Sequence, residues 1–337
     1  MLQPSRIVSI ILAAGKGTRM GETHLHKVCH PVAGTPVIVR SLETYQRAGV
    51  AANLLVVGQY AEQVIHTAAA VPAPVMYCYQ SEQKGTGHAT KIAASLLEAQ
   101  GYAGDILVVA GDKVLEDSIV ERLIATYYAE QCTLAFVVGA VEHFPVSGRI
   151  VTDAHGSIIG NVEVFDIQRM RLLIELRERV GQGPLPADEV KRMALDYFKQ
   201  DKRKAIKALG VIWEHLQHGH PVDWHFLAQH TRVEDYALNI NHRQYAPELL
   251  DHVRYTNLSV YLFKASALYR TLQQLGSANA QHEEYLTDLI GMLAAENARV
   301  EMVPLHYPQE AMAFNTQAEF DEIEAYYTRE TAPVAVG

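Results

Sequence analysis

Short apolar segments alternate with amphipathic segments along residues 7–142 of the chain. IVSIILAA at 7–14 is apolar on both faces, as expected of a buried parallel strand, and DILVVAGD at 105–112 has the same character. Segments with the apolar spacing of helices lie between such strands, among them TPVIVRSLETYQRAG at 35–49. This alternation predicts an α/β fold with a doubly wound, mostly parallel mixed sheet of the Rossmann-like type.

A block of different character interrupts this pattern. Residues 167–254 are charged and have helical spacing, whereas strand-like segments return with RYTNLSVYLFK and RVEMVPLHY. We therefore expect one α/β domain formed by residues 1–166 and 255–330, with a helical insertion at 167–254. Residues 331–337 are expected to form a loose tail.

Charge and composition exclude several classes of partner. The formal net charge of −9 argues against the basic surface that nucleic acids and anionic membranes require. No apolar run reaches transmembrane length, and the N-terminus lacks the features of a signal peptide. Three cysteines lie far apart without metal or redox spacing, which suits a reducing cytoplasm. An anionic substrate must therefore be attracted by local positive charge.

The first strand leads into GKGTRMG at residues 15–21, a glycine-rich and basic loop. A Walker loop places its lysine after the second glycine, and this loop does not. A dinucleotide-binding fingerprint on Gly15 and Gly17 is a weak match that has no need of two basic residues. A nucleoside triphosphate site uses the whole loop, because backbone N–H groups hold phosphate oxygens while Arg19 and Lys27 neutralise charge. The structural alternative is a tight turn with solvated basic residues.

Two further segments follow strands and should lie at the same edge of the sheet. QSEQKGTGHA at 80–89 has amides that could read a base edge, followed by a Gly-Thr-Gly turn. VVAGDK ends a strand in Asp112, whose carboxylate could hold Mg²⁺ against triphosphate oxygens. Each segment alone is also explained by a helix start or a strand-end turn.

Taken together in this order, the segments resemble the pyrophosphorylase domain of N-acetylglucosamine-1-phosphate uridylyltransferases, within the sugar-phosphate nucleotidyltransferases. The similarity extends from Ile7 to Tyr327, apart from the block near 167–254. It is carried by LAAGKGTRM, HKVCHPVAGTPV, QSEQKGTGHA, AGD, SGRIV, GNVEVFD, TNLSVYLF, NAQHEEYLTDLI and AFNTQAEF. The resemblance implies the same doubly wound nucleotide-diphospho-sugar transferase fold.

The resemblance also implies three groups of site residues. Around the triphosphate it implies the catalytic residues Arg19 and Lys27 and the nucleotide-binding residues Ala14, Gly15, Gly17, Gln80, Gly85 and Thr86. Around the acceptor it implies the sugar-binding residues Gly148, Glu163 and Asn257. It implies that Mg²⁺ is held by Asp112 and Asn315.

The reaction that these residues imply is attack of a sugar-1-phosphate oxygen on the α-phosphorus of a nucleotide, with release of pyrophosphate. Such a transfer depends on positioning and charge neutralisation and needs no protein nucleophile.

UTP is the expected nucleotide, dTTP shares its base edge, and UDP-N-acetylglucosamine is the default product. A homo-oligomer is possible. The alternatives are a non-catalytic nucleotide-sugar-binding regulator of the same fold and, on the glycines alone, a nicotinamide oxidoreductase.

The chain departs from the family pattern on the sugar side. The family usually places a lysine two residues after the glutamate, and here Phe165 stands there. Lys113, or a lysine of the run KQDKRK at 199–204, is a candidate to replace the missing charge, although a solvated basic helix face is the simpler interpretation. No hexapeptide repeat follows the α/β part, so acetyl transfer, which bifunctional relatives add, is not expected of this chain.

Overall fold

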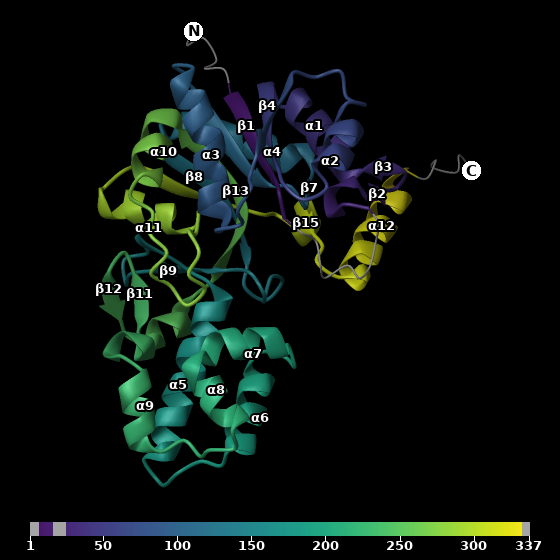
Figure 1. Cartoon of the computed structure of the whole chain (residues 1–337). Helices are drawn as coiled ribbons and strands as arrows, with labels where there is room; N and C mark the ends of the chain where they lie inside the picture. The colour runs from purple at the N-terminus through teal and green to yellow at the C-terminus, as the bar shows by residue number, and fades with distance from the viewer. Residues whose placement is uncertain (1–6, 16–24, 332–337) are drawn as a thin grey trace, which may run out of the picture.

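The computed structural model describes residues 7–15 and 25–331 (Figure 1). Within these residues the centre is a nine-stranded sheet with the order β10-β9-β13-β6-β1-β4-β5, in which β8 also pairs with β13 and β14 pairs with β8. The strands are β1 (Ile7–Ala13), β4 (Val50–Val57), β5 (Val75–Tyr79), β6 (Asp105–Ala110), β8 (Leu134–Ala140), β9 (Arg149–Thr152), β10 (Ile158–Val162), β13 (Tyr255–Lys264) and β14 (Val300–Pro304).

Parallel and antiparallel strands meet in this sheet. β6, β1, β4 and β5 pair in parallel, whereas β13 runs antiparallel to β6, β8 and β9. The predicted α/β class with a mixed sheet is thereby confirmed. The apolar runs of the parallel strands are buried from both sides, which is why they lack the polar alternation of a one-sided sheet.

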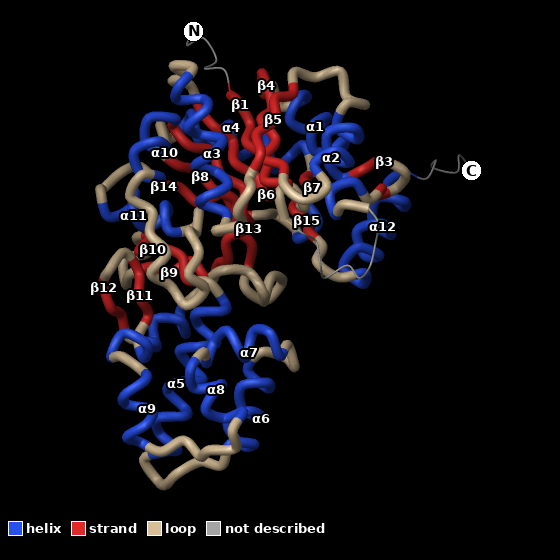
Figure 2. Tube along the Cα trace, in the orientation of Figure 1, coloured by secondary structure: helices blue, strands red, loops and turns tan. Residues whose placement is uncertain are grey.

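Helices cover both faces of the sheet (Figure 2). On one face pack α1 (Val37–Arg47), α2 (Ala61–Ala68) and α4 (Asp117–Ala129), and on the other α3 (Thr86–Ala99), α10 (Ala265–Leu272) and α11 (Asp288–Ala295). Leu42 of α1 and Leu268 of α10 are fully buried against opposite faces. Each such leucine contributes about 2 kcal/mol of hydrophobic stabilisation, so the two layers fix the sheet between them.

Small elements at one end of the sheet bring distant parts of the chain together. β7 (Lys113–Leu115) pairs antiparallel with β15 (Ala311–Ala313), and Lys113 lies opposite Ala313. Around this ladder lie η2 (Lys27–Cys29), β2 (Pro31–Val32), β3 (Thr35–Pro36), η5 (Pro308–Glu310) and α12 (Gln317–Thr331). The ladder places the residue before β7 beside the residues that follow β15.

Residues 164–252 form an excursion from the sheet whose helices lie below it in Figure 1, while residues 238–250 pack against Val151 and Val162 of the sheet. This excursion contains α5 (Val164–Val180), α6 (Ala187–Tyr197), α7 (Lys202–Leu209), α8 (Val211–Gln217), α9 (Trp224–His230), η3 (Val233–Tyr236), β11 (Leu238–Ile240), β12 (Arg243–Tyr245) and η4 (Pro247–His252). The helices have their own hydrophobic core. The block is not wholly helical as expected, because β11 and β12 form a short antiparallel hairpin. We call residues 164–252 the helical lobe.

The chain leaves the sheet for the helical lobe and returns to it at neighbouring strands. Arg149 of β9 is paired with Val162 of β10 on one side and with Thr256 of β13 on the other.

No helix in the described part of the chain is long and apolar enough to span a membrane.

Candidate functional site

The described residues of the predicted phosphate-binding segments lie at the carboxyl ends of β1 and β6. These strands are paired in parallel with Leu12 opposite Ala110, so the residues that follow them emerge at one edge. Ala14 and Gly15 follow β1, and Asp112 follows β6. In open α/β sheets this edge is where ligands bind. Gly17 and Arg19 lie outside the described residues.

Lys27, Asp112 and Asn315 meet at this edge. The β7–β15 ladder brings Asp112 beside Asn315, although 203 positions separate them in the sequence numbering. The Lys27 ammonium donates to Asn315 Oδ1 at 3.1 Å and forms an ion pair with the carboxylate of Asp112. It also lies 5.1 Å from the ring centroid of Phe314. A mostly buried cation is therefore held by the two oxygens that sequence similarity assigned to a metal.

Neighbouring charges control the ionisation of Asp112. Burial opposes ionisation, but the charges of Lys27 and Lys113 outweigh burial and lower the pKa of this carboxyl. Burial lowers the pKa of the Lys113 ammonium, while Asp112 opposes that shift. Asp112 is thus an anion at neutral pH and can bind a cation.

Two side chains fix the backbone where the glycine-rich loop begins. His26 Nε2 lies 3.0 Å from the carbonyl oxygen of Gly15, and burial lowers the pKa of this histidine. Gln83 Nε2 donates to the carbonyl of Ala14 at 2.7 Å. The histidine directly precedes Lys27, so one short segment both orients this backbone and supplies the cation. Sequence reasoning gave His26 no role, although it belongs to the similar segment HKVCHPVAGTPV.

The predicted nucleotide segment is held against residues 284–286 by backbone hydrogen bonds. Gly87 N donates to the carbonyl of Glu284 at 2.8 Å, and Glu284 N donates to the carbonyl of Lys84 at 2.8 Å. Gly85 has a φ of +110°, and a Cβ there would lie 2.4 Å from the Glu284 carbonyl oxygen. Only glycine permits this close approach.

Gln80 and Thr86 contribute in different ways to this segment. Gln80 is buried, and its amide nitrogen lies 3.0 Å from His88 Nδ1 and 3.5 Å from the carbonyl oxygen of Gly85. Thr86 Oγ1 accepts a hydrogen bond from Leu286 N at 3.2 Å. The Gln80 side chain therefore stabilises the turn that carries Gly85 and Thr86.

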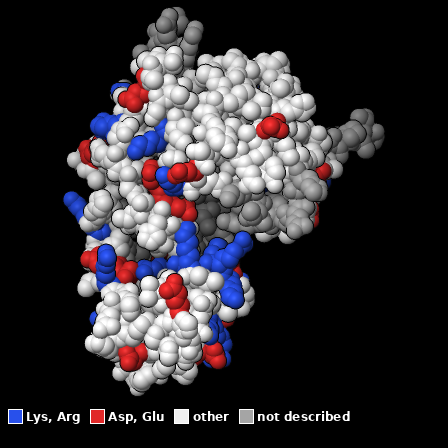
Figure 3. Space-filling view, viewed as in Figure 1, with Lys and Arg blue, Asp and Glu red and all other residues white. Residues whose placement is uncertain are grey.

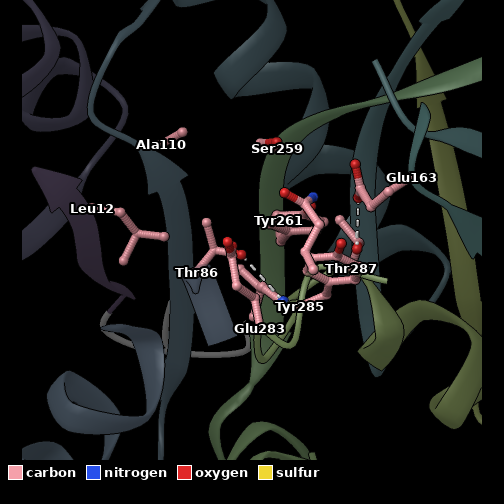
Figure 4. Close-up of a pocket in the computed structure, with 11 residues that line it drawn as sticks. Leu12, Thr86, Ala110, Glu163, Ser259, Tyr261, Glu283, Tyr285 and Thr287 are labelled. Atoms are coloured by element: carbon pink, nitrogen blue, oxygen red, sulfur yellow. Dashed lines mark hydrogen bonds between the residues drawn. The ribbon is translucent and has the colours of Figure 1, made fainter. Parts of the chain in front are cut away.

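A cavity of about 230 Å³ opens between the strand ends and residues 281–287. Figure 4 shows Leu12, Ala110 and Thr86 on one side and Glu163 and Thr287 on the other. The full lining is Leu12, Thr86, Ala110, Glu163, Ser259, Tyr261, Gln281, Glu283, Tyr285, Leu286 and Thr287. The cavity thus joins the predicted nucleotide segment to the predicted sugar-binding glutamate.

The three predicted sugar-binding residues have different positions. Glu163 lines the cavity, and its Oε1 accepts hydrogen bonds from Asn161 Nδ2 and Thr287 Oγ1, both at 2.9 Å. Asn257 is buried, and its Nδ2 donates to the Tyr261 hydroxyl at 2.7 Å. Gly148 leaves room for Asn161, whose Oδ1 would lie 2.6 Å from a Cβ at that glycine. Neither Gly148 nor Asn257 lines the cavity.

Residues 281–287 form one wall of the cavity, and sequence reasoning gave them no individual roles. Their segment, NAQHEEYLTDLI, was recognised only as similar to the family. It lacks the glycines and basic residues that mark a phosphate loop. Its start is shaped by Asn279, whose Oδ1 accepts hydrogen bonds from Gln281 N at 3.1 Å and Glu283 N at 3.2 Å. Such local side-chain bonds are the signal that could have revealed an ordered turn.

Glu163 of the cavity lining lies close to two further acidic residues, Asp166 and Asp288. Burial and the Glu163 charge raise the pKa of Asp166 to about 7. Burial together with Glu163 and Asp166 raises the pKa of Asp288 to about 7 as well. Burial also raises the pKa of Glu163, while its hydrogen bonds to Thr287 and Asn161 oppose the shift. The folded protein therefore favours protonated forms of these carboxyls.

Substituting Asp288 by asparagine should change how stability depends on pH. Folding raises the pKa of Asp288, so protonation of this carboxyl stabilises the folded state at low pH. This stabilisation is lost as pH rises through about 7. Asparagine stays neutral, so the free energy of unfolding of Asp288→Asn relative to wild type should increase by at least about 1 kcal/mol between about pH 5.5 and pH 8.5. Thermal unfolding at both pH values measures this. Asp188→Asn, at a highly exposed site, is the control, and an equal response of both variants would contradict the prediction.

Comparison with known proteins identifies relatives along most of the chain. Residues 9–255 match the family described as the MobA-like NTP transferase domain. The bifunctional protein GlmU of Syntrophotalea carbinolica is 27% identical over 329 residues, which is 97% of this chain and 53% of the relative. GlmU of an Exiguobacterium species is 36% identical over 167 residues, or 49% of this chain and 36% of the relative. The chain thus spans about half the length of the curated relatives that it matches from end to end.

Solved structures share the fold at low sequence identity. A putative glucose-1-phosphate thymidylyltransferase from Bacillus anthracis, in complex with a sucrose, superposes with a TM-score of 0.59 at 13% identity, over 98% of both chains. A UDP-glucose pyrophosphorylase complexed with UDP-glucose gives a TM-score of 0.58 at 13% identity, over 96% of this chain and 99% of the other. At this level of identity the likeness shows the fold alone.

Proposed function

The chain belongs to the MobA-like NTP transferase domain family, and we propose that within it the protein is a Mg²⁺-dependent sugar-1-phosphate nucleotidyltransferase. It would form a nucleoside diphosphate-sugar and pyrophosphate from a nucleoside triphosphate and a sugar-1-phosphate. The observation that carries this proposal is the meeting of Lys27, Asp112 and Asn315 at the carboxyl ends of β1 and β6. A cation and two oxygen ligands gathered at this edge suit a polyanionic nucleotide and its metal ion.

The residues fit a magnesium ion. Asp112 and Asn315 offer a carboxylate and an amide oxygen, and both already contact the Lys27 ammonium. Among residues 7–15 and 25–331, no group of three or more His, Cys, Asp or Glu side chains could hold a metal. An ion held by Asp112 and Asn315 would therefore take further oxygens from phosphate and water, as Mg²⁺ commonly does. When bound, it would supply Lewis-acid polarisation of the phosphate oxygens.

The chain's own residues would bind and orient the two substrates. Lys27 would neutralise the negative charge that accumulates at the reacting phosphates, with Arg19 as its predicted partner from the sequence. Gln83 and His26 hold the carbonyls of Ala14 and Gly15, and the backbone that begins there would bind the triphosphate. The acceptor would occupy the cavity, where Glu163 can accept hydrogen bonds from hydroxyl groups. No protein nucleophile is required, because orientation and charge neutralisation account for this type of transfer.

We further propose UTP as the nucleotide, with dTTP as the second candidate, and N-acetylglucosamine-1-phosphate as the first acceptor to test. Similarity to GlmU proteins over most of the chain supports this choice. A cytoplasmic location and a homo-oligomer remain predictions from the sequence.

The test is pyrophosphate release with Mg²⁺ from UTP, dTTP, CTP, GTP and ATP, each combined with a panel of sugar-1-phosphates. We expect release with one favoured pairing and none when the metal is chelated. A protein that binds a nucleotide-sugar but releases pyrophosphate with no pairing would contradict the proposal and favour the regulatory alternative.

A further inference from the structure

None of the described residues that line the cavity is a lysine or an arginine. The lining does include two acidic residues, Glu163 and Glu283. Because burial favours the protonated form of Glu163, Glu283 is the lining carboxylate that an acceptor carrying a phosphate group must approach. A cation that offsets this charge must come from outside these lining residues.

Among the described residues, such a contact comes from the helical lobe. Lys207 of α7 places its ammonium 3.0 Å from Glu283 Oε1 and 3.4 Å from Gln281 Oε1, and both of these residues line the cavity. Figure 3 shows lysine and arginine side chains gathered in a band across the edge of the helical lobe that faces the rest of the molecule. Lys113, the alternative from the sequence, is buried beside Asp112 instead.

The helical lobe also contacts the same wall at Ala280. Asp166 in the first turn of α5 accepts a hydrogen bond from Ala280 N at 3.2 Å. The Ala280 side chain packs against the hydrophobic core of the lobe. On its other side the wall is bonded to residues 84–87 and, through Thr287, to Glu163. Residues 279–287 are thus held between the helical lobe and the sheet, and we call them the acceptor wall.

We infer that the helical lobe completes the acceptor site, and that Lys207 is a positioning residue that holds the acceptor wall and offsets the charge of Glu283 for a phosphate-bearing acceptor. This inference rests on the proposed function, since it concerns the acceptor of that reaction. Lys207 does not line the cavity, so it acts through Glu283 and Gln281.

The exposure of this ion pair determines what its loss should do. The Lys207 and Glu283 side chains are 40% and 36% exposed, and pairs of this kind contribute little to global stability. Removing Lys207 should therefore leave the protein folded while adding one uncompensated negative charge at the cavity. Repulsion of an anionic acceptor by one partly solvated charge corresponds to a rise in KM of about 3- to 10-fold.

The experiment measures KM and kcat for the acceptor and for the nucleotide in four variants. Lys207→Ala should raise the acceptor KM by about 3- to 10-fold at low salt, with a smaller change in kcat and in the nucleotide KM. Lys207→Arg keeps the charge and should restore the acceptor KM, and Lys207→Ala/Glu283→Gln should restore it by removing the repelling carboxylate. Lys204→Ala removes the same charge from an exposed position on the same helix and is the matched control.

Hydrogen exchange of the acceptor wall gives a second readout that needs no turnover. Backbone amides of residues 280–287 should exchange about 3-fold faster in Lys207→Ala than in Lys204→Ala. An unchanged acceptor KM in Lys207→Ala, or a rise that the double variant does not reverse, overturns the inference while leaving the proposed function standing. If wild-type protein turns over no substrate pair, the proposed function fails. In that case, equal hydrogen exchange of the acceptor wall in Lys207→Ala and Lys204→Ala overturns this inference separately.

Discussion

Replacing Asp112 with alanine is expected to reduce pyrophosphate release by about 10³-fold. The carboxylate is the one full negative charge in the Lys27–Asp112–Asn315 cluster, and the charges of both neighbouring lysines keep it ionised. Its loss would remove the main proposed ligand for Mg²⁺ and leave the mostly buried Lys27 ammonium without its ion pair. Removing a preorganised charge at a phosphoryl-transfer centre has effects of this size.

The measurement is kcat at saturating nucleotide and acceptor, with circular dichroism and thermal unfolding to show that the variant is folded. Asp117→Ala is the matched control, because this aspartate pairs with Arg47 at an exposed position. The control should retain activity within about 2-fold, as expected for a surface ion pair. An Asp112→Ala variant that keeps more than about a tenth of wild-type kcat would contradict the assignment.

Replacing Gly85 with alanine should have the second largest effect. The glycine has a φ of +110°, and the new Cβ would lie 2.4 Å from the Glu284 carbonyl oxygen. Backbone atoms cannot move aside as a flexible side chain can, so residues 84–87 and the acceptor wall would have to separate. We expect a loss of about 2–3 kcal/mol in stability and about 10²-fold in kcat/KM, because small displacements of bound substrates are that costly.

Gly101→Ala separates the two causes of this effect. Gly101 also has a positive φ, +70°, but nothing lies within 4 Å of a Cβ there. It should therefore show only the backbone strain, about 1 kcal/mol, with activity preserved. Kinetics and thermal unfolding of both variants provide the comparison. Equal activity in the two variants would show that the contact between Gly85 and Glu284 does not matter for substrate positioning.

The parts of the fold that could be predicted are those encoded by local patterns. The apolar run of β1 is contiguous in sequence with Ala14 and Gly15, so both the strand and the edge at which these two residues lie follow from local rules. The direction of β13 could not be predicted, because an apolar run looks the same in a parallel or an antiparallel strand. The β11–β12 hairpin is only three residues long on each side, which is too short for an alternating pattern.

The candidate site was likewise predictable only where local sequence marks its residues. Asp112 stands out at a strand end, but its proximity to Asn315 depends on the β7–β15 ladder, and resemblance to a family suggested that pair. Lys207 was not predicted, because the expectation concerned Lys113 and the basic run at 199–204. The position of Lys207 on α7 brings its ammonium to Glu283. Asn257 was expected at the sugar, yet its amide is bonded to the Tyr261 hydroxyl, so it supports a lining residue.

The pairing of β9 with both β10 and β13 has a consequence for how this sequence can change. The helical lobe departs after Val162 and rejoins before Thr256, and both residues flank Arg149, so its two ends lie about two strand spacings, or roughly 10 Å, apart. Closing a chain between two neighbouring points costs conformational entropy that grows only with the logarithm of its length. A longer or shorter excursion at this junction therefore costs the sheet little. Under the proposed function, exchange of the excursion during evolution would alter the acceptor without redesign of the residues that bind the nucleotide.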